Sequence, residues 1–358
     1  MWIEQSPAIG EKEANDMNIK WISDRFNNFS VLECAGSSPL YETLSVQIAK
    51  DHDLLKLCSY AKEGQPIPNL LFGAVHYLLL QGENHELKEF YPSIVEKVKR
   101  KDNPFPLFKD FCILNFDEIR FIIKNKLVQT NEVRRCAYLY PVFCYIYQQT
   151  NKPLSLIEIG TSAGLQLLWD QYAYSYNSNQ IYGKHDSFVH LTSKVRDGNL
   201  SPRLLSLNPP VNDRLGIDLH INDLTNKENY LWLKALIWPE HKGRLKTFEG
   251  AVKQLKLNPP NLIEGDGVAL LSTVTKDIPE NTMICIFHTH VANQMPNDLK
   301  HELIKNVNEL GNHRDVCHIY NNITDKELHV DLIINGITRK SIVGETDGHA
   351  RWFDWNLV

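Results

Sequence analysis

Residues 154–172 place a carboxylate and a glycine turn where a strand would meet a helix. Residues 154–158, LSLIE, run mostly apolar before the turn, as a buried strand does near its carboxyl end. The turn GTSAG comes next, and the leucines after it would form the apolar face of a helix. Bare backbone beside a helix N-terminus can approach and bind a ligand. The candidate ligand-binding residues are Glu158, Gly160, Thr161, Ser162 and Gly164.

The spacing of the two glycines separates three kinds of cofactor turn. A dinucleotide-binding turn needs G-x-G-x-x-G and a P-loop needs a lysine after its last glycine, and neither is present. The pattern found, acid-x-G-x-x-x-G, resembles the first motif of class I S-adenosylmethionine-dependent methyltransferases. The resemblance implies that the Glu158 carboxylate and the turn bind the methionine part of the cofactor, with Ser162 in place of that family's central glycine. The alternative is that a tight strand-to-helix turn needs glycines whatever it binds.

Two aspartates later in the chain also stand at the expected ends of strands. Residues 214–219, RLGIDL, resemble the second strand of class I methyltransferases, which implies that Asp218 binds the ribose of the cofactor. Asp266 follows an expected strand at the position where the resembled fold contacts the adenine amine. A long insertion must separate Asp218 from the glycine turn. Either acid could instead cap a helix or turn, and Asp223 competes with Asp218 for the ribose role.

Two histidines follow the apolar run TMICIF, which predicts a buried strand. His288 stands where the resembled fold has catalytic or substrate-orienting residues, and an imidazole with a pKa near neutrality suits a general base. His290 is the second catalytic candidate. His288 could instead only hydrogen-bond the next turn. Together with Asp266, the pair could also bind a metal ion, as in a metal-dependent hydrolase, but no third ligand stands at a known spacing and we favour a site without metal.

The order of expected helices and strands that position these residues predicts an α/β fold. Residues 15–150 show helical periodicity and no strand–turn–helix signal, which predicts an all-α N-terminal domain over residues 1–150, either a lid or a dimerisation surface. Residues 151–358 predict a Rossmann-like, doubly wound, mostly parallel sheet. An insertion at about 177–213 lacks helical periodicity and predicts a hairpin and a loop.

The C-terminal residues predict two further features. Asn335-Gly336 between two β-type runs is a strong signal for an antiparallel hairpin at the end of the sheet. Residues 347–355 contain two tryptophans and a phenylalanine, which predicts that this tail packs on the protein. We favour packing on a sheet edge over packing at the mouth of the ligand pocket.

Composition narrows the class of protein. The chain has 358 residues, 43% hydrophobic and 23% charged, as in a globular protein with a sizeable core. A net charge of −5 gives no electrostatic footprint for nucleic acid. The polar N-terminal residues predict no signal peptide, the apolar runs are too short for a membrane span, and the seven scattered cysteines predict reduced thiols. We therefore expect a cytoplasmic protein.

Six segments together resemble one uncharacterised bacterial family, domain of unknown function 2332: IEIGTSAGLQLLWDQYAYSY, NPPVNDRLGIDL, LWLKALIWPE, EGDGVALL, FHTHVAN and GHARWFDW. This resemblance spans most of the chain and implies relatives without implying a reaction. The resemblance to class I methyltransferases covers about residues 154–345 and implies S-adenosylmethionine as cofactor.

Two functions follow as hypotheses. The first is an S-adenosylmethionine-dependent methyltransferase that acts on a small molecule. The alternative is a non-catalytic ligand-binding or scaffold protein with a degenerate methyltransferase fold, motivated by Ser162 and by the displaced Asp218. For either function we expect a small-molecule ligand, no nucleic-acid or membrane partner, and a homodimer through the helical domain.

Overall fold

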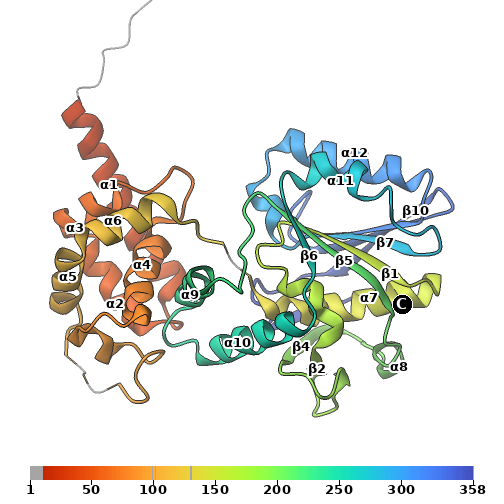
Figure 1. The fold of residues 1–358 in the computed structure, drawn as a ribbon, viewed down its shortest axis with the longest axis horizontal. Helices are drawn as coiled ribbons and strands as arrows, with labels where there is room; N and C mark the ends of the chain where they lie inside the picture. Colours follow the sequence, from red (N-terminus) through yellow and green to blue (C-terminus); the bar gives the residue numbers. More distant parts are fainter. Residues whose placement is uncertain (1–10, 99, 101, 130, 358) are drawn as a thin grey trace, which may run out of the picture. The chain divides into compact units, whose positions relative to one another are not determined.

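The computed structural model describes residues 11–98, 100, 102–129 and 131–357, which form two compact units (Figure 1). The helical unit contains the described residues up to 129 together with Lys227–Leu245, and the sheet unit contains Asn131–Asn226 and the described residues from Lys246 on. Helix α7 (Cys136–Thr150) belongs to the sheet unit, although the sequence predicts it within the helical domain. No helix in the described ranges is both long and apolar enough to cross a bilayer.

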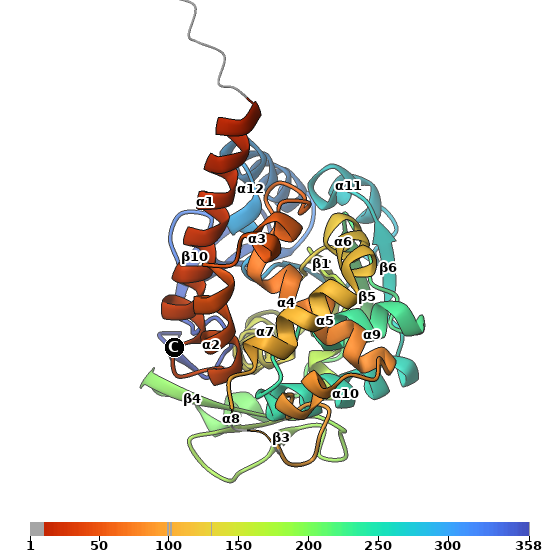
Figure 2. The same cartoon turned by 90° about the vertical axis from the view of Figure 1, so that its left-hand side faces the viewer.

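The described part of the helical unit is built from helices alone (Figure 2), and aromatic side chains form part of its core. Phe72 lies at the centre of this core, where its ring stacks on Tyr41 with centroids 4.1 Å apart and meets the rings of Phe26 and Phe108 edge-on. The elements are α1 (Glu11–Phe29), η1 (Ser30–Cys34), α2 (Pro39–Ile48), α3 (His52–Cys58), α4 (Ile67–Gln81), η2 (Glu86–Phe90), α5 (Phe105–Leu114), α6 (Phe116–Asn125) and α9 (Lys227–Ala235).

The sheet unit contains a seven-stranded sheet in the order β10-β9-β8-β7-β1-β5-β6. The five strands from β8 to β6 are parallel, whereas β9 and β10 form the predicted antiparallel hairpin at one edge. The prediction of an α/β protein with a mostly parallel sheet is confirmed. The strands are β1 (Leu154–Ile159), β5 (Val211–Asp218), β6 (Asn261–Glu264), β7 (Met283–Phe287), β8 (Val316–Tyr320), β9 (Leu328–Ile334) and β10 (Ile337–Gly344).

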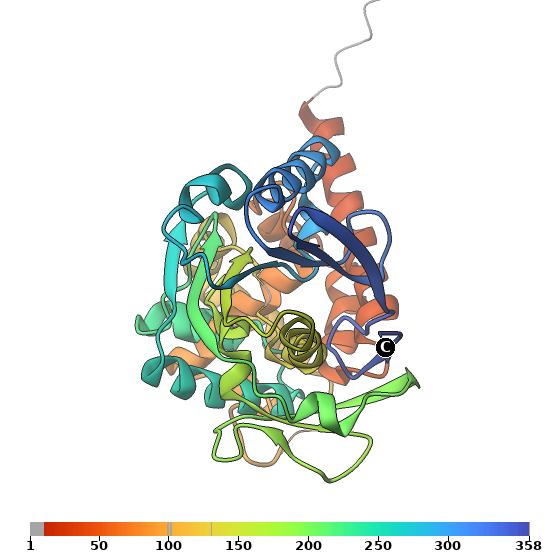
Figure 3. The same cartoon turned by 90° about the vertical axis from the view of Figure 1, so that its right-hand side faces the viewer.

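Helices cover both faces of this sheet (Figures 1 and 3). On one face, Ile157 and Ile284 pack in a core with Leu271 of α11 (Gly267–Val274) and Leu303 of α12 (Asn297–Gly311). On the other face, α7 packs on the sheet, and the rings of Phe143 and Phe287 meet edge-on at 5.5 Å. The central strands are buried on both faces, which explains why they read as nearly unbroken apolar runs.

A second, four-stranded sheet has the order β11-β4-β2-β3. Most of it comes from the chain between β1 and β5, where the sequence predicts only a hairpin and a loop. The C-terminal strand β11 pairs in parallel with β4, so the tail docks on a sheet edge as predicted. The strands are β2 (Ala173–Tyr176), β3 (Tyr182–Gly183), β4 (His190–Gly198) and β11 (Trp352–Trp355).

The connections carry the remaining elements. The helix expected after Gly164 is a 3-10 helix, η4 (Leu165–Gln171), interrupted at Leu168. The others are η3 (Val133–Arg135), α8 (Pro202–Leu205), α10 (Lys242–Leu257) and η5 (Val291–Gln294).

Candidate functional site

The candidate residues lie at the carboxyl ends of the parallel strands. From β1, the chain continues to β5 and β6 on one side and to β7 and β8 on the other, so the strand order reverses between β1 and β7. Ligands of open α/β sheets bind at such a reversal, outside the carboxyl ends. The topology therefore brings Glu158, Asp218, Asp266 and His288 to one edge of the sheet.

Glu158 is a buried carboxyl group at the end of β1. Its side chain is 3% exposed, and Thr161 Oγ1 donates a hydrogen bond of 2.6 Å to its Oε2. Burial raises the pKa of Glu158 to about 8, against the opposing effects of the Thr161 hydrogen bond and the charge of Arg135. The carboxyl group therefore holds its proton at neutral pH.

The glycine turn is held by side chains of the sheet unit itself. Gly160 has φ +74°, and a Cβ atom built on it would lie 2.4 Å from Cγ2 of Val291, the first residue of η5. Gly164 has φ +75°, and a Cβ atom there would lie 2.9 Å from Leu262. Ser162 also has a left-handed conformation, with φ +53°. Packing thus explains both glycines, and the side chain of Val291 covers the backbone at Gly160.

Asp218 contacts the glycine turn directly. Its Oδ2 accepts a hydrogen bond of 2.7 Å from Ser162 N, and its Oδ1 accepts one from His220 N. The second sheet absorbs the long insertion, because β5 still pairs with β1 and ends beside the turn. Asp223, the competing residue, instead closes its own turn by accepting hydrogen bonds from Thr225.

Asp266 is the N-cap of α11. Its Oδ1 accepts hydrogen bonds from Val268 N at 2.8 Å and Ala269 N at 3.2 Å. The capping role that its sequence context allows is therefore confirmed, and the role in binding adenine stays a prediction. A cap that uses one carboxylate oxygen leaves Oδ2 for another donor.

His288 and His290 follow β7 but make different contacts. His288 is fully buried, with its Nε2 3.2 Å from Nε2 of His318 on β8. The backbone turns at His290, where φ is +62°, and its N–H donates to Oδ1 of Asn321. Because the backbone leaves the extended conformation, the two imidazoles contact different residues. In the described part of the chain, no group of three His, Cys, Asp or Glu side chains could hold a metal ion.

The two imidazoles differ from the near-neutral base that the sequence suggests. Burial lowers the pKa of His288 to about 4. Burial also lowers the pKa of His290 to about 4, and the nearby charge of Arg135 adds to this effect. Both rings are therefore neutral at physiological pH and weak as proton acceptors.

Arg135 belongs to the same region, and the sequence does not reveal it. Its Nε donates to Gly348 O at 3.1 Å and its Nη1 to Thr289 O at 3.3 Å. Thr289 Oγ1 in turn donates to Gln166 Oε1 at 3.1 Å. Arg135 lies in a stretch whose helical pattern predicts the N-terminal domain, so no sequence signal connects it with residues more than 150 positions away. The position of Thr289 between the two histidines is the one signal for that residue.

The C-terminal turn also reaches this region. His349 Nδ1 lies 3.1 Å from Oε2 of Glu132, in addition to the contact between Gly348 and Arg135. The tail thus docks on the edge of the second sheet through β11, and the turn before it contacts Arg135 and Glu132. Packing at the mouth of the ligand pocket stays a prediction.

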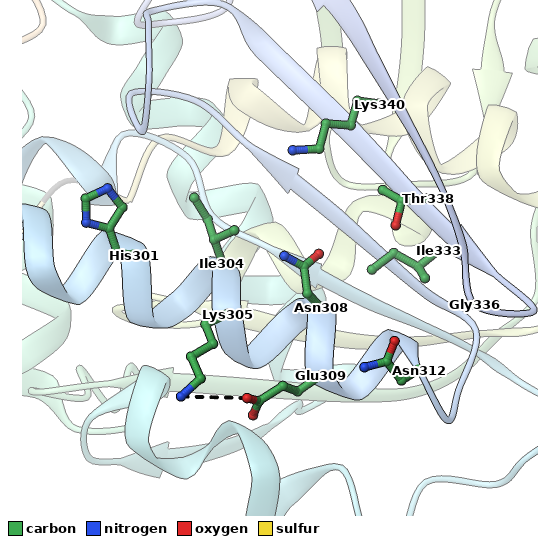
Figure 4. Close-up of a pocket in the computed structure, with 10 residues that line it drawn as sticks. All are labelled: His301, Ile304, Lys305, Asn308, Glu309, Asn312, Ile333, Gly336, Thr338 and Lys340. Atoms are coloured by element: carbon green, nitrogen blue, oxygen red, sulfur yellow. Dashed lines mark ion pairs between the residues drawn. The ribbon is translucent and has the colours of Figure 1, made fainter.

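Two hollows in the surface of the sheet unit lie away from the glycine turn. Figure 4 shows the first, of about 580 Å³, where side chains of α12 face those of the β9–β10 hairpin. The second, of about 530 Å³, has Arg134, Lys194 and Arg351 among its lining residues. None of the candidate residues of the glycine turn lines either hollow.

Comparison with known proteins identifies the relatives of the chain. The sequence model of a family described as uncharacterized protein conserved in bacteria, DUF2332, matches residues 23–355. The chain belongs to this family. The DUF2332 match covers both units, so the helical unit is part of the family and not an addition to it. No curated protein and no solved structure matches the chain.

Proposed function

We propose that the sheet unit of this DUF2332 protein is a Rossmann-like domain that binds S-adenosylmethionine and transfers its methyl group to a small molecule. The observation that carries the proposal is the hydrogen bond between Ser162 N and Asp218 Oδ2. It joins the turn after β1 to the acid at the end of β5. A cofactor that binds across the carboxyl ends of these two neighbouring strands needs both groups close together.

The donors and acceptors fit the nucleoside part of the cofactor. Asp218 accepts hydrogen bonds from Ser162 N and His220 N at the end of β5, and a carboxylate at such a strand end can bind ribose hydroxyls. Asp266 keeps Oδ2 for the adenine amine. The methionine part fits the turn only when the side chain of Val291 moves off Gly160.

The protein residues would divide the work of methyl transfer. When bound, S-adenosylmethionine would supply an activated methyl group on its sulfonium sulfur. The protein must then hold the acceptor in line with that group. His290 suits this role, because its Nε2 is buried and has no hydrogen-bond partner within the described residues. Its pKa of about 4 favours orienting the acceptor by a hydrogen bond over removing a proton.

A non-catalytic ligand-binding or scaffold protein is the second candidate, and one observation favours it. The side chain of Val291 occupies the space over Gly160 that the cofactor would need. In a scaffold that has lost the chemistry, this contact would be permanent, and neither S-adenosylmethionine nor its product would bind.

Calorimetric titration of the purified full chain separates the two candidates. We expect S-adenosylmethionine and S-adenosylhomocysteine to bind with micromolar affinity and NAD not to bind. Asp218→Asn should weaken binding of both ligands at least tenfold, whereas Asp213→Asn, an exposed position on the same strand, should not. A cooperatively unfolding protein that binds neither ligand would exclude the methyltransferase and favour the scaffold.

A further inference from the structure

Arg135 is a buried cation that two turns hold in place. It ends η3 and is 8% exposed. Its Nε donates to Gly348 O, and its Nη1 donates to both O and Oγ1 of Thr289. The turn after β7 and the C-terminal turn thus fix the position of the guanidinium plane.

All the acceptors that Arg135 contacts are neutral. Among the described residues, no carboxylate forms an ion pair or hydrogen bond with it. Glu158 is near enough for Arg135 to influence it, but burial keeps that carboxyl group protonated at neutral pH. Glu132 and Asp347 contact His349 and Arg351 instead. A buried charge without a counter-charge is costly, and proteins normally pair it.

Two buried polar groups in the turns after β7 and β8 also lack a hydrogen-bond partner among the described residues. Asn321 is fully buried, and its Oδ1 accepts the His290 N–H while its Nδ2 has no hydrogen bond within the described residues. The same holds for Nε2 of His290, whose neutral imidazole is close enough to Arg135 for that cation to lower its pKa. Nη2 of Arg135 likewise makes no hydrogen bond with the described part of the chain. Three groups that can donate hydrogen bonds are therefore unused in one region.

We propose that Arg135, with Asn321 and His290, binds the carboxylate of a small organic acid at the end of β7. A guanidinium binds a carboxylate through two parallel hydrogen bonds, and a single buried cation balances its single negative charge. A phosphate carries nearly two charges at neutral pH, more than this one cation balances. In terms of the proposed function, on which this assignment of substrate class rests, the methyl acceptor is a carboxylic acid.

The test measures the thermal stability of the full chain against simple carboxylates. Acetate, succinate and benzoate are titrated at constant ionic strength, with chloride as reference and acetamide as the uncharged analogue. At least one carboxylate should raise the unfolding temperature with a saturating dependence on concentration, and acetamide should not. Arg135→Lys keeps the positive charge but loses the two parallel N–H donors of the guanidinium. It should raise the half-saturating concentration of carboxylate at least tenfold. Arg134→Lys, at the half-exposed neighbour, is the matched control and should respond like the wild type.

Several results would overturn the assignment. These are an equal response of wild type and Arg135→Lys, no saturating response to any of the three carboxylates, or a response to phosphate alone. S-adenosylhomocysteine and 5′-methylthioadenosine, which lacks the carboxylate, are titrated in parallel. If Arg135→Lys weakens only S-adenosylhomocysteine, Arg135 binds the cofactor and the acceptor assignment is wrong. If the wild type binds neither nucleoside but still binds a carboxylate, the methyltransferase proposal fails while the carboxylate site stands.

Discussion

At the level of single residues, the contact between Gly160 and Val291 explains why the turn has a glycine at this position. The sequence suggests that Gly160 allows a ligand to approach the backbone, whereas the structure has the isopropyl group of Val291 in that space. Gly336 provides a matched comparison, because it has the same φ of +74° and nothing lies within 4 Å of its Cβ position. A side chain would cause the same backbone strain at both glycines, but it would clash with a neighbouring side chain only at Gly160.

Gly160→Ala should therefore destabilise the protein more than Gly336→Ala. Both substitutions carry the cost of a left-handed residue, about 1–2 kcal/mol, and overpacking adds about 1–3 kcal/mol at Gly160. Adding Val291→Ala to Gly160→Ala should recover part of the difference, because it removes the two closest atoms. Urea unfolding of the wild type and the three variants measures these differences. Equal losses at the two glycines would mean that Val291 does not fill this space in solution.

The buried carboxyl group of Glu158 predicts a pH dependence of stability. Its pKa is about 8 in the folded protein against 4.5 for the exposed group, and burial is the main cause. Between these values the folded state binds more protons than the unfolded state, so this group makes stability fall as pH rises, by up to about 1.4 kcal/mol per pH unit. Glu158→Gln should remove this component.

Unfolding free energies at pH 5, 6, 7 and 8 measure the effect. Relative to wild type, Glu158→Gln should gain stability steadily across this range. Glu302→Gln, at an exposed position of α12, is the control and should change little. A difference between Glu158→Gln and wild type that does not change with pH would show that Glu158 is ionised in the folded protein.

The docking of β11 on β4 is, at the element scale, the contact that brings the C-terminal turn to Arg135. Gly198 pairs with Trp355, and a Cβ atom on Gly198 would lie 1.8 Å from Trp355 O. No rotamer change relieves a clash with a backbone atom, so Gly198→Ala should displace β11. We expect faster hydrogen exchange over residues 352–355 and weaker carboxylate binding at Arg135. Gly336→Ala is again the control, and normal protection of β11 in Gly198→Ala would contradict the pairing.

The elements differ in how far the sequence predicts them. The strand β7 and the hairpin at Asn335-Gly336 follow from local patterns, and both are present. The helix expected after Gly164 is a 3-10 helix in the structure. The sequence does not predict this difference, because local periodicity does not distinguish the two helix types over one or two turns.

Contacts between distant parts of the chain are beyond such patterns. The covering of Gly160 by Val291 joins residues that local sequence does not relate, and so does the contact of Arg135 with Thr289. The second sheet combines the segment after β1 with the last strand of the chain, which no local period reveals. For the candidate site, the sequence therefore predicts which acids stand at strand ends, and tertiary packing decides whether they are free to bind.

At the scale of the whole molecule, the homodimer through the helical unit stays a prediction. The α5–α6 region exposes large apolar side chains, with Leu114 and Phe121 each 67% exposed. Such side chains are typical of an interface between subunits. Sedimentation velocity should show a dimer for the wild type and a monomer for Phe121→Glu, with Lys124→Glu on the same helix as a control. A monomeric wild type would contradict the prediction.

A crystal structure of the full chain with S-adenosylhomocysteine tests the proposed cofactor site most directly. We predict the ribose hydroxyls on Asp218, the homocysteine part at the turn formed by residues 160–164, and the side chain of Val291 displaced from Gly160. A structure with the ligand bound elsewhere, or with no ligand at millimolar concentration and Val291 still covering Gly160, would contradict the proposed cofactor site.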